Sequence, residues 1–166
     1  IASTSMSLFR NKYLKDNVFW RHDTWVLDKQ FKAVFGGRTE AFNCGKFENY
    51  YYYDVRSMYP YIMTKEFPDP HTMRHHYKNT IDNIQHFEVI SHVSVECPYM
   101  KYPLLPFRTK DKILFPYGTW SEWYTHVELR RAISLGYKIT KVHETFYYLK
   151  TCKPFKEMIL ALYDLR

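Results

Sequence analysis

An aromatic stretch that ends in an acid is the feature of this sequence that most limits how the chain can fold. Residues 47–55 read FENYYYYDV, so aromatic rings follow one another without the alternation of a half-exposed strand. Such a run is typical of a strand that is covered on both faces. Asp54 therefore lies at the end of a predicted buried strand. Proline is tolerated only in the first turn of a helix, so Pro60 predicts that a helix begins at Ser57 or Met58.

The length and charge of the chain set the broad class. The chain has 166 residues, of which 46% are hydrophobic, and we expect one compact unit. A net charge of +7 favours an anionic partner, with nucleic acid as the first candidate. The apolar runs are short and interrupted by charges, which predicts that no membrane is involved.

The three cysteines, Cys44, Cys97 and Cys152, are odd in number and form no CxxC pair. Neither a disulfide framework nor a zinc site is indicated. We therefore expect a reducing intracellular compartment: the cytoplasm, an organelle matrix or a virus-infected host cell.

Periodicity and turn residues divide the rest of the chain into helices and strands. We predict a short helix within residues 1–16, a strand at 39–42 after the glycine pair Gly36-Gly37, and a surface connection from Phe67 to Thr80. Further strands are predicted at 86–97 and 137–149, a hairpin at about 101–120 with Lys110 to Lys112 near its tip, and helices at 125–135 and 153–166. This order indicates an α+β fold with a mainly antiparallel sheet packed by helices.

The turn between the aromatic run and the next helix, residues 54–60 with the sequence DVRSMYP, suits phosphoryl transfer. That chemistry needs a rigidly held carboxylate for Mg²⁺, and the end of a strand provides one at Asp54. The backbone N–H groups at a helix start attract anions, so a triphosphate can lie against Ser57 and Met58. In the alternative interpretation, Asp54 only caps the helix and the tyrosines belong to the core.

The same residues resemble motif A of the family B DNA polymerases, whose pattern is Asp-x-x-Ser-Leu-Tyr-Pro, and only Met58 departs from it. The resemblance implies the palm domain of a DNA-directed DNA polymerase that uses two Mg²⁺ ions. It also implies that Asp54 is catalytic and binds metal together with the backbone carbonyl of Val55. Ser57, Met58 and Tyr59 would bind the nucleotide, with Tyr59 as the ring that excludes a 2′-hydroxyl.

Flanking segments resemble the organellar, viral and protein-primed branch of that family. Residues 5–10 are similar to the segment after the exonuclease domain. Gly36-Gly37 is similar to the loop that joins exonuclease and palm and contacts template DNA, although Val34 stands where relatives have tyrosine. The implied organisation is a linking segment at about 1–46, motif A at about 47–66, palm plus a terminal-protein-region insertion at about 86–149, and a helix leading to the fingers at 153–166.

The implied partners are a DNA primer–template, a deoxynucleoside triphosphate (dNTP) and a terminal priming protein. Basic residues alternate with aromatic ones in the later part of the chain, a mixture that suits phosphate contact and base stacking. The residues predicted to bind DNA are Gly36, Gly37, Arg38, Arg108, Lys110 and Lys112.

Several polymerase motifs are missing from these residues. The sequence contains no Asp-x-Asp for a second metal-binding carboxylate, no Lys-x-x-x-Asn-x-x-Tyr-Gly fingers motif and no exonuclease Asp-x-Glu. We therefore expect half of a two-metal site, inactive by itself. Two other hypotheses stay open: a non-catalytic module derived from a polymerase that binds DNA or a priming protein, and a structural domain.

The histidines suggest no further chemistry. His71, His75 and His76 have no cysteine or carboxylate to complete a metal site and are predicted to lie on the surface. His143 and Glu144 are predicted to form a structural pair.

Overall fold

The computed structural model describes residues 2–14, 21–77 and 81–165. The residues outside these ranges include the ends of the predicted helices at 1–16 and 153–166 and part of the predicted connection at 67–80. The chain forms two compact units, where its length predicted one: the first comprises residues 1–18, 36–67 and 152–166, and the second 19–35 and 68–151. No helix in the described ranges is both long and apolar enough to span a membrane.

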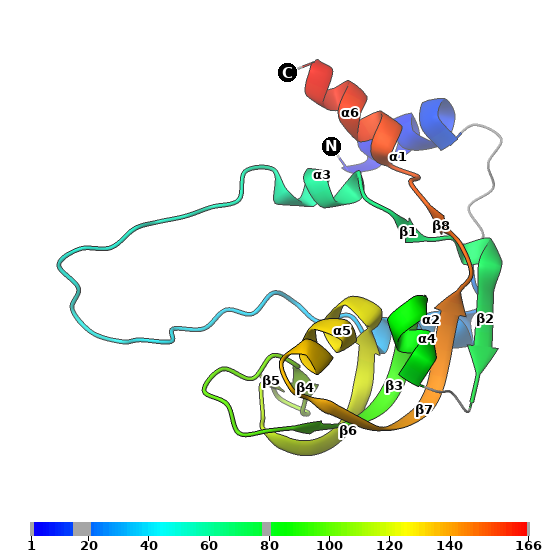
Figure 1. The fold of residues 1–166 in the computed structure, drawn as a ribbon. Helices are drawn as coiled ribbons and strands as arrows, with labels where there is room; N and C mark the ends of the chain where they lie inside the picture. The colour runs from blue at the N-terminus through cyan, green and yellow to red at the C-terminus, as the bar shows by residue number, and fades with distance from the viewer. Residues whose placement is uncertain (1, 15–20, 78–80, 166) are drawn as a thin grey trace. The chain divides into compact units, whose positions relative to one another are not determined.

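The second unit is built around a four-stranded antiparallel sheet (Figure 1). Its strands are β2 (Met73–His76), β3 (Glu88–Cys97), β6 (Gly118–Thr125) and β7 (Lys138–Tyr148), in the order β2-β7-β3-β6. β3 pairs with β6 on one side and with β7 on the other. The predicted strands at 86–97 and 137–149 and the antiparallel arrangement are confirmed.

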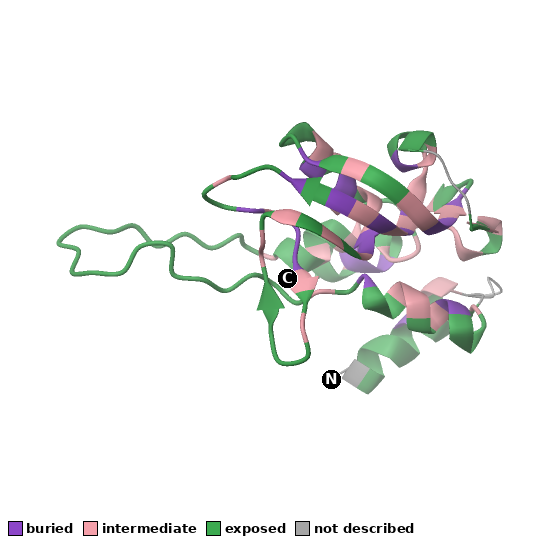
Figure 2. Cartoon of the chain, turned by 90° about the horizontal axis from the view of Figure 1, so that it is seen from below, coloured by how far each residue is buried: buried purple, intermediate pink, exposed green. Residues whose placement is uncertain are grey.

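Helices pack on both faces of this sheet, against different side chains of β3. Val89, Val93 and Val95 on one face belong to the cluster of buried side chains that includes α4 (Ile81–His86) and α5 (His126–Ser134). Ile90 on the other face packs against the cluster of α2 (Thr24–Lys32), which includes Val26. The α+β fold with helices packed on the sheet is thus confirmed, and Figure 2 shows buried residues along the strands.

Local sequence signals account for α5 and for the hairpin before it. Thr125 caps α5, and its N–H donates a hydrogen bond of 3.0 Å to the Glu128 carboxylate as part of a capping box. Gly136 has φ +93°, a conformation that favours glycine, and ends the helix. β4 (Phe107–Arg108) pairs with β5 (Ile113–Leu114), and the Thr109 N–H donates to Lys112 O at 2.9 Å across the tip. The helix predicted at 125–135 and the hairpin predicted at about 101–120 are both confirmed.

The first unit contains a small cluster of helices and a long irregular segment that leads into α3. It contains α1 (Ala2–Leu8), the π-helix η1 (Phe9–Leu14), α3 (Met58–Met63) and α6 (Lys156–Asp164). Phe9, Met158 and Ile159 form its buried centre, and the rings of Phe9 and Phe155 are 5.1 Å apart. The short elements β1 (Phe67–Pro68), η2 (Pro70–Thr72) and β8 (Thr151–Cys152) complete the described secondary structure. The predicted helices near both ends of the chain are confirmed.

The predicted strand at 47–55 is wrong for this structure. The segment is irregular, and the side chains of Tyr50, Tyr51, Tyr52 and Tyr53 are 82–89% exposed; Figure 2 shows it within a long exposed loop. A strand needs a neighbour to pair its backbone N–H and C=O groups, and no strand of the described chain pairs with these residues. The predicted strand at 39–42 is likewise absent from the described secondary structure.

The connection predicted at 67–80 and the surface histidines also need correction. This segment contains β2, which pairs with β7 in the register Met73↔Tyr148. The His75 ring stacks on Phe146 with centroids 4.6 Å apart, and its Nε2 lies 2.8 Å from Glu144 Oε1. His75 therefore belongs to the packing of the sheet, although its neighbours His71 and His76 are exposed.

The polar partner of Glu144 differs from the one predicted. Its carboxylate accepts hydrogen bonds from Lys29 of α2 and contacts His75, while His143 Nε2 lies 2.7 Å from Ser94 Oγ. Burial raises the pKa of Glu144, but the hydrogen bonds from Lys29 and His75 outweigh burial and hold the pKa below its usual value. The Lys29–Glu144 pair joins α2 to the sheet.

Replacement Glu144→Gln should lower the free energy of unfolding by about 2 kcal/mol at neutral pH. Because the folded-state pKa is lowered, the ionised carboxylate stabilises the fold above the unfolded pKa of about 4.5, and this contribution is lost as pH falls through the folded pKa. Urea unfolding of both proteins between neutral pH and about pH 3 measures the difference, which should shrink below about pH 4. Glu48→Gln, at an exposed site, is the control. A difference that stays constant with pH would contradict this account.

Candidate active site

Five of the residues predicted to bind metal or nucleotide lie around one hollow in the first unit. Its volume is about 460 Å³, and Tyr53 to Val55 and Ser57 to Pro60 line it. These residues belong to the end of the aromatic run and the beginning of α3. The structure thus brings together Asp54, Val55, Ser57, Met58 and Tyr59, which follows in part from their closeness in sequence.

The turn that carries these residues has an unusual backbone at Ser57. Its φ of 55° and ψ of 37° lie in the left-handed region, and no other non-glycine residue in the described ranges has a positive φ. This conformation costs about 1–2 kcal/mol and is often found at functional sites. It turns the chain from the extended segment into α3, whose Tyr61 N–H donates to Ser57 O at 3.0 Å.

The backbone groups at this turn are only partly used. The Met58 N–H donates to Val55 O at 3.3 Å, a long hydrogen bond. A carbonyl oxygen has a second lone pair, so the Val55 carbonyl keeps the capacity to bind a cation. The Met58 N–H would have to give up its bond to Val55 before it could donate to a phosphate.

Asp54 is exposed, and within the described residues it has no hydrogen-bond or ion-pair partner. The described residues contain no group of three histidine, cysteine or acidic side chains that could hold a metal ion. Asp54 and the Val55 carbonyl are oxygen donors of the kind that Mg²⁺ prefers. They therefore fit part of a magnesium site, which needs further ligands from elsewhere.

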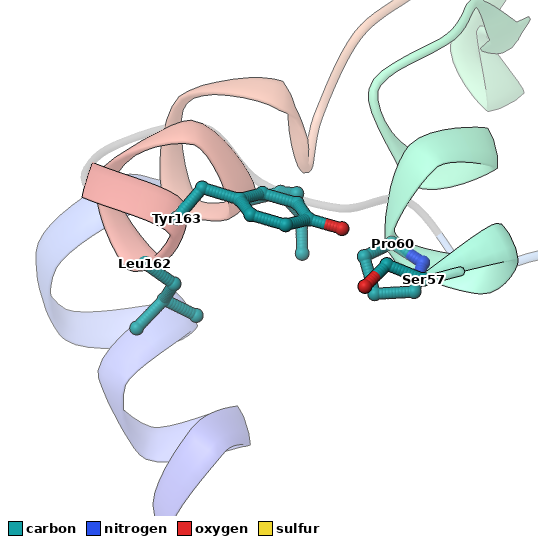
Figure 3. Close-up of a pocket in the computed structure, with 5 residues that line it drawn as sticks. Ser57, Pro60, Leu162 and Tyr163 are labelled. Carbon is teal, nitrogen blue, oxygen red and sulfur yellow. The ribbon is translucent and has the colours of Figure 1, made fainter. Parts of the chain in front are cut away.

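A second, more apolar hollow lies between α3 and α6 and shares Ser57 with the first. Its volume is about 170 Å³, and it is lined by Ser57, Pro60, Ile159, Leu162 and Tyr163. Figure 3 shows the Tyr163 side chain extending from α6 toward Pro60 and Ser57. The α6 residues were not predicted at the site, and their apolar helical spacing gave no signal beyond packing.

Arg108, predicted to bind DNA, has structural contacts in the second unit. Its guanidinium donates to Val34 O at 2.8 Å and to Lys32 O at 3.4 Å, and it lies 4.6 Å from the centroid of the Phe35 ring. It thereby holds the segment after α2 against β4. Lys110 and Lys112, at the tip of the same hairpin, are exposed.

The residues predicted to bind template DNA in the first unit lie in exposed irregular chain. Arg38 forms an ion pair with Glu40 at 2.5 Å, and its guanidinium lies 5.1 Å from the Phe42 ring centroid. Gly36 and Gly37 have no positive φ, and a Cβ on either would meet no atom within 4 Å. Neither glycine is required by the described structure, so a role for them depends on a close approach by a partner.

The comparisons with known proteins agree with the motif at Asp54. The whole chain, residues 1–166, matches the family described as DNA polymerase type B, organellar and viral. It is 29% identical to a probable DNA polymerase of Neurospora intermedia and 28% identical to one of Ascobolus immersus, each over 100% of this chain. The fold resembles the solved Phi29 DNA polymerase, with a TM-score of 0.64 at 18% identity over 98% of this chain.

This chain belongs to the organellar and viral family of type B DNA polymerases. It spans 18% and 14% of the length of these two fungal relatives and 31% of the Phi29 DNA polymerase chain. The α+β fold predicted from the sequence and the predicted family are therefore confirmed, and the roles of individual residues stay predictions.

Proposed function

We propose that this chain is part of a DNA-directed DNA polymerase that transfers nucleotides from dNTPs to a primer 3′-hydroxyl during DNA replication, and that it is inactive without the rest of the enzyme. The observation that carries the proposal is the hollow formed by Asp54, Ser57 and Tyr59 at the start of α3, in a chain that matches this family throughout. Asp54 is the one carboxylate among the described residues that line this hollow, and two-metal transfer needs more ligands. This supports the proposal that the chain is inactive without the rest of the enzyme.

The residues around the hollow have separate proposed roles. The Asp54 carboxylate and the Val55 carbonyl would bind Mg²⁺, which stabilises the negative charge that develops on the transferring phosphoryl group. Ser57 and Met58 would hold the triphosphate through backbone N–H groups, and the Tyr59 ring, 78% exposed here, would lie against the sugar. Such positioning supplies much of the rate enhancement in phosphoryl transfer.

The remaining segments fit the same proposal. Residues of about 1–46 would link an exonuclease domain to the palm, residues of about 86–149 would contain an insertion that contacts a terminal priming protein, and residues 153–166 would lead to the fingers. Gly36, Gly37, Arg38, Lys110 and Lys112 would contact DNA, with Arg108 supporting the hairpin. The cysteines are free thiols in the structure, which suits a reducing compartment.

In the complete enzyme, Asp54→Asn should reduce primer extension by at least about a thousandfold, because the amide cannot provide an anionic metal ligand. Primer–template affinity should change little. A gel assay measures extension, and fluorescence anisotropy measures affinity. Asp28→Asn, at an exposed position of α2, is the charge-matched control. Extension by the Asp54 variant at the parental rate would exclude the proposed role.

Removing the ring at Tyr59 tests its proposed contact with the sugar. The Tyr59→Val enzyme should incorporate ribonucleotides with at least about tenfold higher kcat/KM relative to the matching deoxyribonucleotides, because the clash with the 2′-hydroxyl is relieved. Tyr61→Val on the same helix is the control. An unchanged ratio would remove Tyr59 from the site.

A second candidate function is a binding module that holds DNA or a priming protein without catalysis. It is favoured by the lining of the hollow, where Asp54 is the one carboxylate among the described residues. Such a module would bind DNA in a salt-dependent way with no effect of Mg²⁺ or dNTP, since phosphate neutralisation requires neither.

A further inference from the structure

Two exposed tyrosines form a ring pair at one end of the sheet in the second unit. Tyr99 follows β3 and Tyr117 precedes β6, and the register Cys97↔Gly118 sets the two chain segments side by side. Their ring centroids are 5.4 Å apart in an edge-to-face arrangement. Tyr99 is 84% exposed and Tyr117 is 63% exposed. The pair therefore buries little of its own ring surface and leaves it open to a third ring.

The chain around this ring pair is held firmly by the core. Tyr137, which is buried, accepts a hydrogen bond from the Leu104 N–H at 2.7 Å, and buried Tyr124 donates to Pro106 O at 2.6 Å. Leu105 between them is fully buried. A proline with a fixed φ directly precedes each exposed tyrosine. The backbone of residues 104–106, between the two tyrosines in sequence, is thus fixed before any partner binds.

The segments that carry the ring pair, and the strand end beside them, have more basic than acidic residues. Lys101 lies two residues after Tyr99, with its Nζ 5.0 Å from the Tyr102 ring centroid, and Lys138 pairs in register with Glu96 at the same end of the sheet. Lys110 and Lys112 are exposed at the tip of the β4–β5 hairpin, which leads into Tyr117. Glu96 and Asp111 are the acidic residues on these segments. The surface therefore suits an anionic partner that carries flat rings.

We propose that Tyr99 and Tyr117 stack on unpaired bases of single-stranded nucleic acid while Lys101, Lys110, Lys112 and Lys138 contact its phosphates. Aromatic side chains beside basic residues are the usual means of binding single strands without sequence preference. Double-stranded nucleic acid fits less well because its bases already stack on each other. The surface goes beyond the proposed nucleotidyl transfer, since binding here requires neither Asp54 nor a metal ion.

The test is binding of a fluorescein-labelled oligothymidylate of about a dozen nucleotides to this 166-residue chain, measured by anisotropy at low salt with EDTA present. The parental chain should bind the single strand more tightly than a duplex of equal length. The double variant Tyr99→Leu/Tyr117→Leu should bind it about tenfold or more weakly, whereas Tyr99→Phe/Tyr117→Phe should stay within about twofold. Tyr77→Leu, at a site 67% exposed in the same unit, should bind like the parent.

A second measurement is independent of whether the leucine variant folds. Photocrosslinking of a bromouracil-substituted strand to the unaltered chain should label Tyr99 or Tyr117, as mapped by mass spectrometry. Binding and crosslinking should be the same with EDTA as with Mg²⁺ and dNTP present, so a failure of the polymerase assignment would leave this result unchanged. Equal affinity of a folded leucine variant, crosslinks only at other residues, or no binding by the parent would overturn the proposal; the last outcome would favour a protein partner for this surface.

Discussion

The pairing of β3 with two neighbours is the constraint on which the second unit depends. Because β3 lies between β6 and β7, its backbone groups are paired along both edges, and its side chains must be apolar or hydrogen-bonded on both faces. Val93 on one face and Ile90 on the other then bring separate helices to the sheet. The ion pair of Lys29 with Glu144, the cap of α5 and the support of the tyrosine pair all build on this arrangement.

The segment that carries Asp54, unlike β3, has no neighbouring strand among the described residues. Its tyrosines have the composition of a covered strand, yet the described residues offer it no strand to pair with. This chain spans less than a fifth of the length of these two fungal relatives. Under the proposed function, a strand that pairs with this segment would come from other parts of the polymerase. Under the same proposal, those parts would also cover the aromatic run, fix Asp54 and supply the second carboxylate.

Elements that depend on residues close together in sequence could be predicted, whereas those that depend on contacts between distant residues could not. Alternation in β3, Gly136 after α5 and Pro60 at the start of α3 are local signals, and each predicted its element correctly. The aromatic run failed because a strand is defined by its partner, which no local pattern contains. His75 was misplaced for the same reason: its burial results from the pairing of β2 with β7, which lies far away in sequence. The hollow around Asp54 was predictable because one short motif forms it, whereas Leu162 and Tyr163 of α6 come from the other end of the chain.

The central claim is that Asp54 binds the catalytic metal of a complete polymerase. The most direct measurement replaces Mg²⁺ with Fe²⁺ in that enzyme, bound to primer–template and dNTP, and maps where locally generated hydroxyl radicals cut the protein chain. The account predicts cleavage at residues 53–57, abolished by excess Mg²⁺ and by Asp54→Asn. Cleavage confined to other parts of the protein, with residues 53–57 intact, would contradict it.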